Sequence, residues 1–435
     1  MFLTDLTMAA RNLAQHTKRS LFLGTAIAVV SGVFVLLGGL TAGIRSAMLE
    51  SGTTLQTGHV NVGGFFKPTS GSSAPLVTDW EKVLADTRRI VPDIDYVAVR
   101  MRGYAKSVSE NASMDLVLSG VDVAKEPRLK SVVQLKAGRL DDLGQPGTIL
   151  LFEDQAKRLE VTVGDALTLS APTERGASNT TDVKVVAIAR NVGILSSFCA
   201  FTPSVTLRQL YNLKASSTGA LQLYLSDERR SVAVAERLRE GLKQAGYRVM
   251  DPDPQPYWMK LFVKVNAEDW TGQKLDVTTW EDELSFLTWI LTALEWLGKI
   301  LGGVLVVIVL IGIMNTLAIA IRERTREIGT MRAIGMQRRK VLVLFILEML
   351  SLGLLGSLGG ALAAAGLAAL LNAAHLPVPE AFLMIVMRDH WQLLVTPDPV
   401  ISSALFVSVV TVLGAIYPSW KASRLKPVTA MHHIG

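Results

Sequence analysis

Residues 21–44 read LFLGTAIAVVSGVFVLLGGLTAGI, a stretch without one charged side chain. A helix rises about 1.5 Å per residue, so about 20 apolar residues cross the hydrocarbon layer of a bilayer. We therefore expect a first transmembrane helix over residues 21–44. A signal peptide is the alternative interpretation, but its apolar core would be only about 7 to 15 residues long.

Three more stretches of this kind lie in the last third of the chain. Residues 300–321 and 399–420 carry no charge, and residues 341–374 are apolar apart from Glu348. The pattern predicts four transmembrane helices and leaves residues 45–299 outside the membrane. Only 19% of the 435 residues are charged, below the roughly 25% of soluble domains, which argues against an ordinary soluble enzyme.

The basic residues predict the orientation, because cytoplasmic flanks collect Lys and Arg. They are concentrated in residues 1–20, 322–340 and 421–435, whereas residues 375–398 hold Arg388 against three acidic side chains. We expect both termini and the 322–340 segment in the cytoplasm, with residues 45–299 and 375–398 outside it. The net charge of +6 therefore reflects topology, and no nucleic-acid binding is predicted.

The large outer segment shows alternation of strand-like and helical patterns. Strand-like stretches flank a helical pattern at 80–90, and a second unit places a helix at 229–244 before a strand at 247–251. Residues 126–218 between them read as an inserted, mostly β subdomain, with strand-like stretches at 149–152, 166–170 and 183–189 and a Ser/Thr-rich loop at 177–181. The predicted fold is thus an α-helical membrane protein with four transmembrane helices plus a large α+β extracytoplasmic domain, containing two strand-helix-strand units and an inserted β subdomain.

The helical pattern continues past the first two membrane stretches. Residues 42–56 extend the first helix outward, and residues 281–299 lead into the second with apolar side chains at helical spacing. We expect both helices to project from the membrane as a stalk within the 45–299 segment.

Motifs for catalysis are absent from the sequence. There is no G-x-x-x-x-G-K-[ST] phosphate loop, no H-E-x-x-H and no G-x-S-x-G. A single Cys199 excludes an intrachain disulfide and a multi-cysteine zinc site, and His432 with His433 reads as a solvated tail. We predict no catalytic residues, no metal site and no cofactor in this chain.

The segment after the second membrane stretch is the most informative. Residues 321–340 read IRERTREIGTMRAIGMQRRK. Retention of basic loops in the cytoplasm explains the arginines, but it does not explain the apolar and small residues Ile328, Gly329, Met331, Ile334, Gly335 and Met336. A short helix with apolar and small residues beside charged ones suits docking into a groove of another protein.

This segment also resembles a known family. The stretch 324–337, followed by a helix with Glu348, is similar to the permease subunits of ABC transporters of the MacB, FtsX and lipoprotein-releasing (Lol) type. The resemblance extends to residues 10–20, to 138–140 and 159–165 in the outer domain, and to 418–430. The sequence GHVNV at 58–62 is most similar to the LolC/LolE group, whereas the outer domain is longer than that of a typical FtsX.

The resemblance implies a type VII ABC transporter permease subunit in a bacterial inner membrane. It implies that ATP and Mg²⁺ are bound by a partner, a cytoplasmic ABC ATPase in two copies, because this sequence lacks the ATPase that is fused to MacB. A second permease copy or paralogue, a periplasmic carrier or adaptor, and membrane lipids are the other implied partners. The expected ATPase-coupling residues are Arg324, Glu327, Ile328, Gly329, Arg332, Ala333 and Gly335.

The cargo that the resemblance implies first is a lipoprotein, extracted from the membrane and released by mechanotransmission. Apolar stripes on the first two helices are the candidate lining of its cavity: Val35, Leu36, Leu40, Ile44 and Met48, with Leu294, Leu297, Leu301 and Val304. Packing of helix on helix, or contact with lipid, is the alternative interpretation of these stripes. MacB-like efflux of peptides or drugs with a periplasmic adaptor, and FtsX-like regulation of a cell-wall hydrolase, remain alternative functions.

Two features of the third membrane stretch also have two interpretations. Glu348 lies inside it, where an ionisable group is either functional or structural, and we favour a structural role. Gly356 and Gly360, with Gly353, Gly359 and Gly366, form small-residue faces that allow a neighbouring helix to approach closely.

Overall fold

The computed structural model describes residues 11, 17–69, 71–173 and 177–424. The resemblance at 10–20 falls largely outside the described residues, and so do His432 and His433. The chain divides into two compact units. The helical unit comprises Met1–Arg45, Leu291–Pro377 and His390–Gly435, and the sheet unit comprises Ser46–Ile290 and Val378–Asp389.

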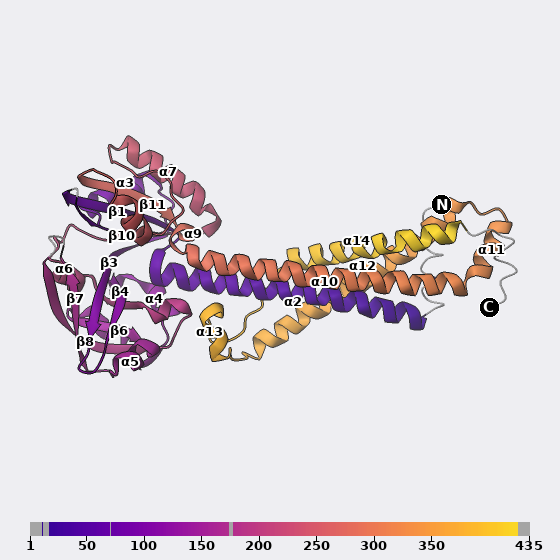
Figure 1. Ribbon diagram of the computed structural model, residues 1–435, viewed down its shortest axis with the longest axis horizontal. Helices are drawn as coiled ribbons and strands as arrows, with labels where there is room; N and C mark the ends of the chain where they lie inside the picture. Colours follow the sequence, from indigo (N-terminus) through magenta and orange to yellow (C-terminus); the bar gives the residue numbers. More distant parts are fainter. Residues whose placement is uncertain (1–10, 12–16, 70, 174–176, 425–435) are drawn as a thin grey trace. The chain divides into compact units, whose positions relative to one another are not determined.

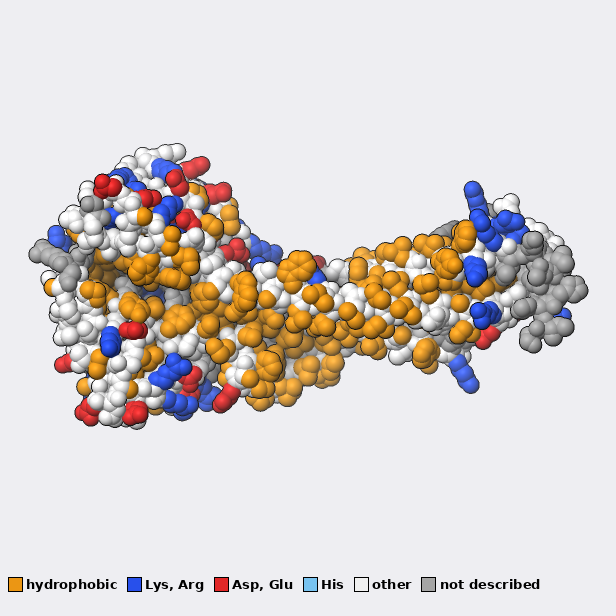
Figure 2. All heavy atoms as spheres, viewed as in Figure 1, with side chains coloured by type: hydrophobic (Ala, Val, Ile, Leu, Met, Phe, Trp, Pro, Cys, Tyr) orange, Lys and Arg blue, Asp and Glu red, His pale blue; other side chains and the backbone are white. Residues whose placement is uncertain are grey.

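Four long helices dominate the helical unit (Figure 1). They are α2 (Thr17–Gly52), α10 (Ser285–Glu323), α12 (Arg338–Ala373) and α14 (Pro397–Ser423). All four are long and apolar enough to cross a membrane, and the face of the helical unit seen in Figure 2 is largely hydrophobic between its ends. The short helix α11 (Thr325–Ala333) links α10 to α12.

Glycines let α2 and α12 approach each other closely. A Cβ atom added to Gly360 would lie 2.0 Å from the carbonyl oxygen of Ala28, and one added to Gly356 would lie 3.0 Å from that of Gly24. Gly353 instead faces α14, where an added Cβ would lie 3.2 Å from Thr411. The predicted small-residue packing is confirmed at Gly353, Gly356 and Gly360, but it is wrong at Gly359 and Gly366, where nothing lies within 4 Å of an added Cβ.

Buried hydroxyl groups join the same three helices. Ser31 of α2 donates to the carbonyl oxygen of Ser357 on α12 at 2.8 Å, and Ser357 donates to the carbonyl oxygen of Ala404 on α14 at 3.0 Å. Since each hydroxyl finds a backbone acceptor, no polar side chain in this set is buried without a partner.

The sheet unit is built on an 11-stranded sheet in which two parts meet at one strand. The first part has the order β11 (Gly272–Thr279), β1 (Val60–Thr69), β10 (Ala220–Tyr224) and β3 (Tyr96–Val108), with all neighbours antiparallel. The helices α3 (Trp80–Ile90) and α7 (Ser231–Gln244) pack on it through an apolar core. The chain runs β1-α3-β3 and β10-α7-β11, so the first predicted strand-helix-strand unit is confirmed, and the second is confirmed in its first strand and its helix.

The closing strand of the second unit is not the one expected. Residues 247–251 form only an isolated bridge between Val249 and Leu275, and β11 takes their place beside β1. Prolines at 252, 254 and 256 explain the difference, because proline lacks the N–H that continues a ladder. The chain instead makes two short helical turns, α8 (Tyr257–Lys260) and η6 (Leu261–Val265).

The inserted β subdomain forms the second part of the sheet. The second half of β3 pairs with β4 (Ser113–Val121), and the order continues through β9 (Cys199–Pro203), β6 (Thr148–Phe152), β8 (Ser178–Ala189) and β5 (Leu135–Gly138). The strand β7 (Ala166–Pro172) pairs with β8 and β3. Residues 178–181, expected in a loop, therefore begin β8, where Thr180 is opposite Ser170.

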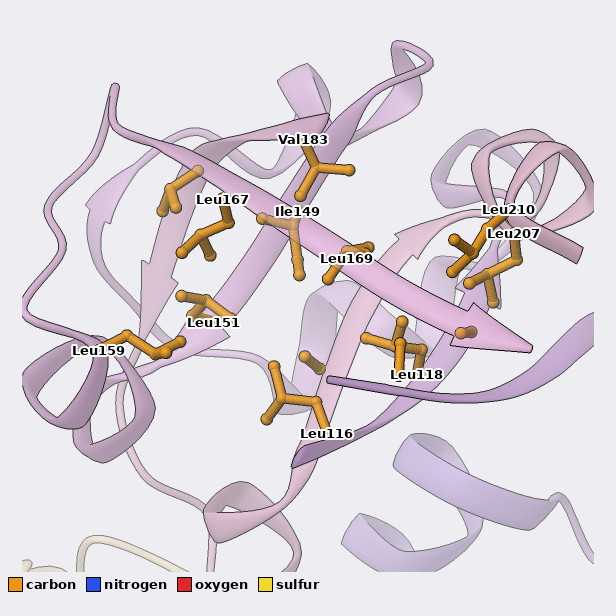
Figure 3. Packing of buried hydrophobic residues seen from close by; sticks show 14 of the residues in the cluster. Leu116, Leu118, Ile149, Leu151, Leu159, Leu167, Leu169, Val183, Leu207 and Leu210 are labelled. Carbon is orange, nitrogen blue, oxygen red and sulfur yellow. The ribbon is translucent and has the colours of Figure 1, made fainter. Parts of the chain in front are cut away.

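A leucine-rich core holds this subdomain together. Figure 3 shows Leu116 and Leu118 of β4 in one core with Ile149 and Leu151 of β6 and Leu169 of β7. The helices α5 (Glu153–Leu159) and α6 (Ser204–Tyr211) cover this core.

Shorter elements complete the sheet unit. They are β2 (Ser72–Ala74), α4 (Pro127–Val132), α9 (Trp280–Glu283), α13 (Glu380–Val386), the π-turn η1 (Thr53–Thr57), and the 3-10 turns η2 (Val123–Lys125), η3 (Leu140–Gly144), η4 (Ile194–Ser197) and η5 (Glu228–Arg230).

Candidate coupling site

The predicted coupling segment folds as a short helix between two sharp changes of direction. Helix α10 ends at Glu323, Arg324 leaves the helical conformation with φ −96° and ψ 11°, and α11 runs from Thr325 to Ala333. Gly335 then adopts φ +107°, which glycine reaches without the strain that a side chain would add. Figure 1 shows α11 at the end of the helical unit, beyond the long helices.

One side of α11 is packed inside the unit. Ile328 is fully buried among Leu317, Ala320 and Val341, and Gly329 is also buried. An apolar side chain at this position therefore fixes α11 against α10 and α12.

Two arginines of the segment bind within the chain. Nη1 of Arg324 lies 3.5 Å from Oε2 of Glu348 on α12, and both side chains are buried. Nη1 of Arg332 donates to the carbonyl oxygen of Ser423 on α14 at 2.8 Å. The segment is thus linked to α12 and α14. Glu348 has a partner inside the chain, which agrees with the structural role that we favoured from the sequence.

The other side of α11 and the following turn are exposed. Of the predicted coupling residues, Glu327, Ala333 and Gly335 are exposed. Ile334 was noted in the sequence as unexplained by a basic loop but was not among the predicted coupling residues, and 83% of it is exposed. We call Glu327, Ala333, Ile334 and Gly335 the exposed coupling set.

The residues predicted to line a cargo cavity fall into two groups. On α2, Val35 packs against Ala361 and Ala364 of α12, and Ile44 is also buried, while Leu36 and Leu40 are half-buried. Met48 is buried within the sheet unit. On α10, Leu294 is half-buried, whereas Leu297, Leu301 and Val304 are 53%, 44% and 53% exposed. The α2 group packs mainly inside its own chain, and the α10 group is available to a neighbour, a cargo or lipid.

Among the described residues, no group of three or more His, Cys, Asp or Glu side chains could hold a metal ion. The segment combines a buried apolar anchor at Ile328, two arginines with partners inside the chain, and an exposed carboxylate near an exposed apolar side chain.

Comparisons with known proteins indicate the family of this chain. A family model described as MacB-like periplasmic core domain matches residues 22–240, and one described as FtsX-like permease C-terminal matches residues 299–427. The macrolide export ATP-binding/permease protein MacB of Burkholderia cenocepacia is 24% identical over 98% of this chain and 57% of that protein. MacB of Syntrophobacter fumaroxidans is 30% identical over 34% of this chain and 18% of that protein. The uncharacterised ABC transporter permease YvrN of Bacillus subtilis is 34% identical over 28% of this chain and 26% of that protein.

The chain thus spans less than two thirds of the length of these relatives. Among solved structures, the periplasmic region of MacB from Actinobacillus actinomycetemcomitans matches with a TM-score of 0.30 and 14% identity, covering 53% of this chain and 92% of that one. With the two family models together covering most of the described residues, the chain belongs to the ABC transporter permeases that carry a MacB-like periplasmic core domain and an FtsX-like C-terminal region.

Proposed function

We propose that this chain is the permease subunit of an ABC transporter whose separate ATPase subunits, binding ATP and Mg²⁺, act on α11 and so drive work outside the cytoplasm. The observation that carries the proposal is the two-sided environment of α11. Its inner side is held to α12 and α14 by Arg324, Ile328 and Arg332, while the exposed coupling set remains open to a partner. A displacement of α11 would therefore act on the long helices.

Charge reversal on the exposed side tests this docking. Loss of one charged partner at a desolvated contact costs about 2–5 kcal/mol, so Glu327→Lys should abolish copurification of the ATPase and transport. Ile334→Asp should do the same by exposing a charge to an apolar contact. Glu295→Lys, at an exposed glutamate of α10, is the matched control and should keep both. If the Glu327→Lys protein and the Ile334→Asp protein both transported normally, α11 would not be the docking site of the ATPase.

The permease without its partner should hydrolyse no ATP, since its sequence contains no phosphate loop. We place the complex in a bacterial inner membrane with two permease chains and two ATPase chains, the arrangement that the family implies.

For the cargo, we propose a lipoprotein that is extracted from the membrane. Support comes from the exposed apolar stripe of Leu297, Leu301 and Val304 on α10, because acyl chains gain about 0.8 kcal/mol per buried CH₂. A second candidate is efflux of a macrolide-like compound or a peptide through an adaptor, since several relatives are named macrolide export proteins.

A photo-crosslinker at Leu297 distinguishes the two cargoes. During transport it should capture a triacylated protein, whereas the same crosslinker at Leu355 of α12, which is 70% exposed, should capture mainly lipid. If Leu297 captured only phospholipid or the partner permease, the lipoprotein proposal would fail. Copurification of a periplasmic adaptor would then favour efflux.

A further inference from the structure

A cavity of about 830 Å³ lies within the sheet unit, between its four-stranded part and the inserted β subdomain. Its walls come from the β1–β2 region, β3, the ends of β7 and α6, the turns α8 and η6, and the start of α10. Its volume falls within the roughly 300–1,000 Å³ typical of small-molecule sites. The coupling site and the α10 stripe do not include these residues.

The lining of the cavity is mostly apolar and aromatic. Its principal apolar members are Leu76, Phe198, Leu213, Trp258, Leu261 and Phe286. Trp258 is 46% exposed, and the neighbouring Phe262 is 72% exposed. A well-packed domain would normally bury such side chains, so the wall formed by α8 and η6 offers apolar surface that a ligand could cover.

The charged groups of the wall neutralise each other. Nη2 of Arg102 lies 3.5 Å from Oε1 of Glu283, and the guanidinium lies 4.1 Å from the centre of the Tyr257 ring. Both carboxylate oxygens of Glu283 also accept hydrogen bonds, Oε1 from Thr278 Oγ1 at 2.8 Å and Oε2 from the Tyr257 backbone N–H at 3.2 Å. The wall therefore presents no net charge, and a charged ligand would lose hydration without gaining a counter-ion.

One donor in the wall is not used by the protein. Among the described residues, the Tyr257 hydroxyl makes no hydrogen bond. Burial raises the pKa of Tyr257 to about 12, so the hydroxyl stays protonated at neutral pH and can donate to an acceptor oxygen.

From this geometry we propose that the cavity binds a neutral, mostly apolar molecule with an ester or carbonyl oxygen, which accepts a hydrogen bond from the Tyr257 hydroxyl. Such a molecule has two sources, the acyl-ester part of a membrane lipid and a soluble apolar ester. The proposal does not depend on the function proposed above, because it concerns binding to the permease chain without its ATPase.

Photoaffinity labelling of the full chain in lipid nanodiscs tests the proposal. One arm uses a neutral diacylglycerol with a diazirine on one acyl chain, and the other uses a soluble aromatic ester with the same diazirine. Mass spectrometry of the peptides should locate label from at least one probe in residues 72–76 and 257–262. Labelling by the first probe alone would identify a lipid source, and labelling by the second alone a soluble ligand.

Two substitutions make the test specific. Ala74→Trp places a large side chain in the wall, since Ala74 lines the cavity and is half-buried, and should lower labelling of both segments at least tenfold. Ala233→Trp on the exposed side of α7 is the matched control and should leave it unchanged. Labelling of α12 and α14 by the lipid probe, equal in all three proteins, shows that each is inserted in the nanodisc.

Tyr257→Phe tests the proposed hydrogen bond from the Tyr257 hydroxyl to the ester oxygen. It also keeps the proposal testable if the Ala74→Trp protein fails to fold. It should weaken binding of the ester probe about two- to tenfold, the usual effect of one hydrogen bond. Binding of an analogue in which methylene groups replace the ester should not change. Absence of label from both segments with both probes would overturn the proposal, and so would equal labelling of the native and Ala74→Trp proteins. It would also be overturned if Tyr257→Phe bound the ester probe as tightly as the native protein does.

Discussion

Glu348 shows how one residue links a membrane helix to the coupling segment. It is 2% exposed, and its carboxylate faces Arg324 across the turn that joins α10 to α12. The sequence could show that a carboxylate lies inside an apolar helix, but not its partner, because the two residues are 24 positions apart. Pairing of buried charges depends on the packing of helices, which no local pattern encodes.

Removing the carboxylate should destabilise the helical unit. Glu348→Leu leaves the guanidinium of Arg324 without this partner, and breaking a buried pair costs about 3–5 kcal/mol. We expect a lower Tm in detergent, measured by intrinsic fluorescence, and recovery of much of the loss in Glu348→Leu with Arg324→Met. Glu327→Leu, at an exposed carboxylate on α11, is the control. A Glu348→Leu protein with the same Tm as the native chain would show that the Arg324–Glu348 pair contributes nothing to stability.

Cys199 should be chemically inert in the folded chain. It is buried in β9, and burial raises the pKa of its thiol to about 12. The thiolate is the reactive form, so its fraction stays negligible at neutral pH and grows only as the pH approaches that pKa. We expect a maleimide at pH 7.5 to add no mass to the native protein, and to add one label after denaturation. Rapid single labelling of the folded protein would contradict the buried position.

At the scale of elements, the long helices and most strands could be predicted, whereas their ends could not. Apolar runs and alternation identified α2, α10, α12, α14, β6 and β7. The sequence did not reveal that α9 and α10 are separate, because this depends on a local arrangement in which Thr279 and Asp282 cap α9 and Leu284 leaves the helix. It also misplaced the last strand of the second unit, because pairing with β1 is a long-range contact.

Neighbouring glycines of α12 give opposite predictions. An added Cβ at Gly360 would lie 2.0 Å from the Ala28 oxygen, whereas nothing lies within 4 Å of one added at Gly359. Gly360→Ala should therefore push α2 and α12 apart and cost about 1–3 kcal/mol. Gly359→Ala should be neutral or stabilising by about 0.5–1 kcal/mol, since alanine favours the helix. Thermal unfolding of both variants measures the difference, and equal Tm values would show that the two helices do not pack at Gly360.

At the scale of the whole molecule, the class of protein could be read from the sequence, but the cargo could not. The order of apolar stretches and the coupling segment indicate a permease, and both family models agree. The predicted cargo residues separate into the largely packed Val35 group and the exposed Leu297 group. Which group would meet a cargo depends on contacts with other chains, and such contacts are not encoded in one chain.

The orientation of the chain can be tested at three exposed positions. Ser178 begins β8, Asp389 follows α13, and Gln337 precedes α12, and all three residues are exposed. The concentration of arginine and lysine in residues 322–340 predicts that Gln337 lies in the cytoplasm and the other two outside it. Because Cys199 should not react, the native chain can serve as the background for single cysteines.

An impermeant maleimide should therefore label Ser178→Cys and Asp389→Cys in intact spheroplasts, but Gln337→Cys only after permeabilisation. After permeabilisation, all three variants should be labelled equally. This control shows that each introduced cysteine can react with the maleimide, because exposure of the original side chain alone does not guarantee it. If Gln337→Cys reacted in intact spheroplasts while Ser178→Cys did not, the chain would be inverted. The exposed coupling set would then lie on the side without ATP, and docking of a cytoplasmic ATPase on α11 would be physically impossible.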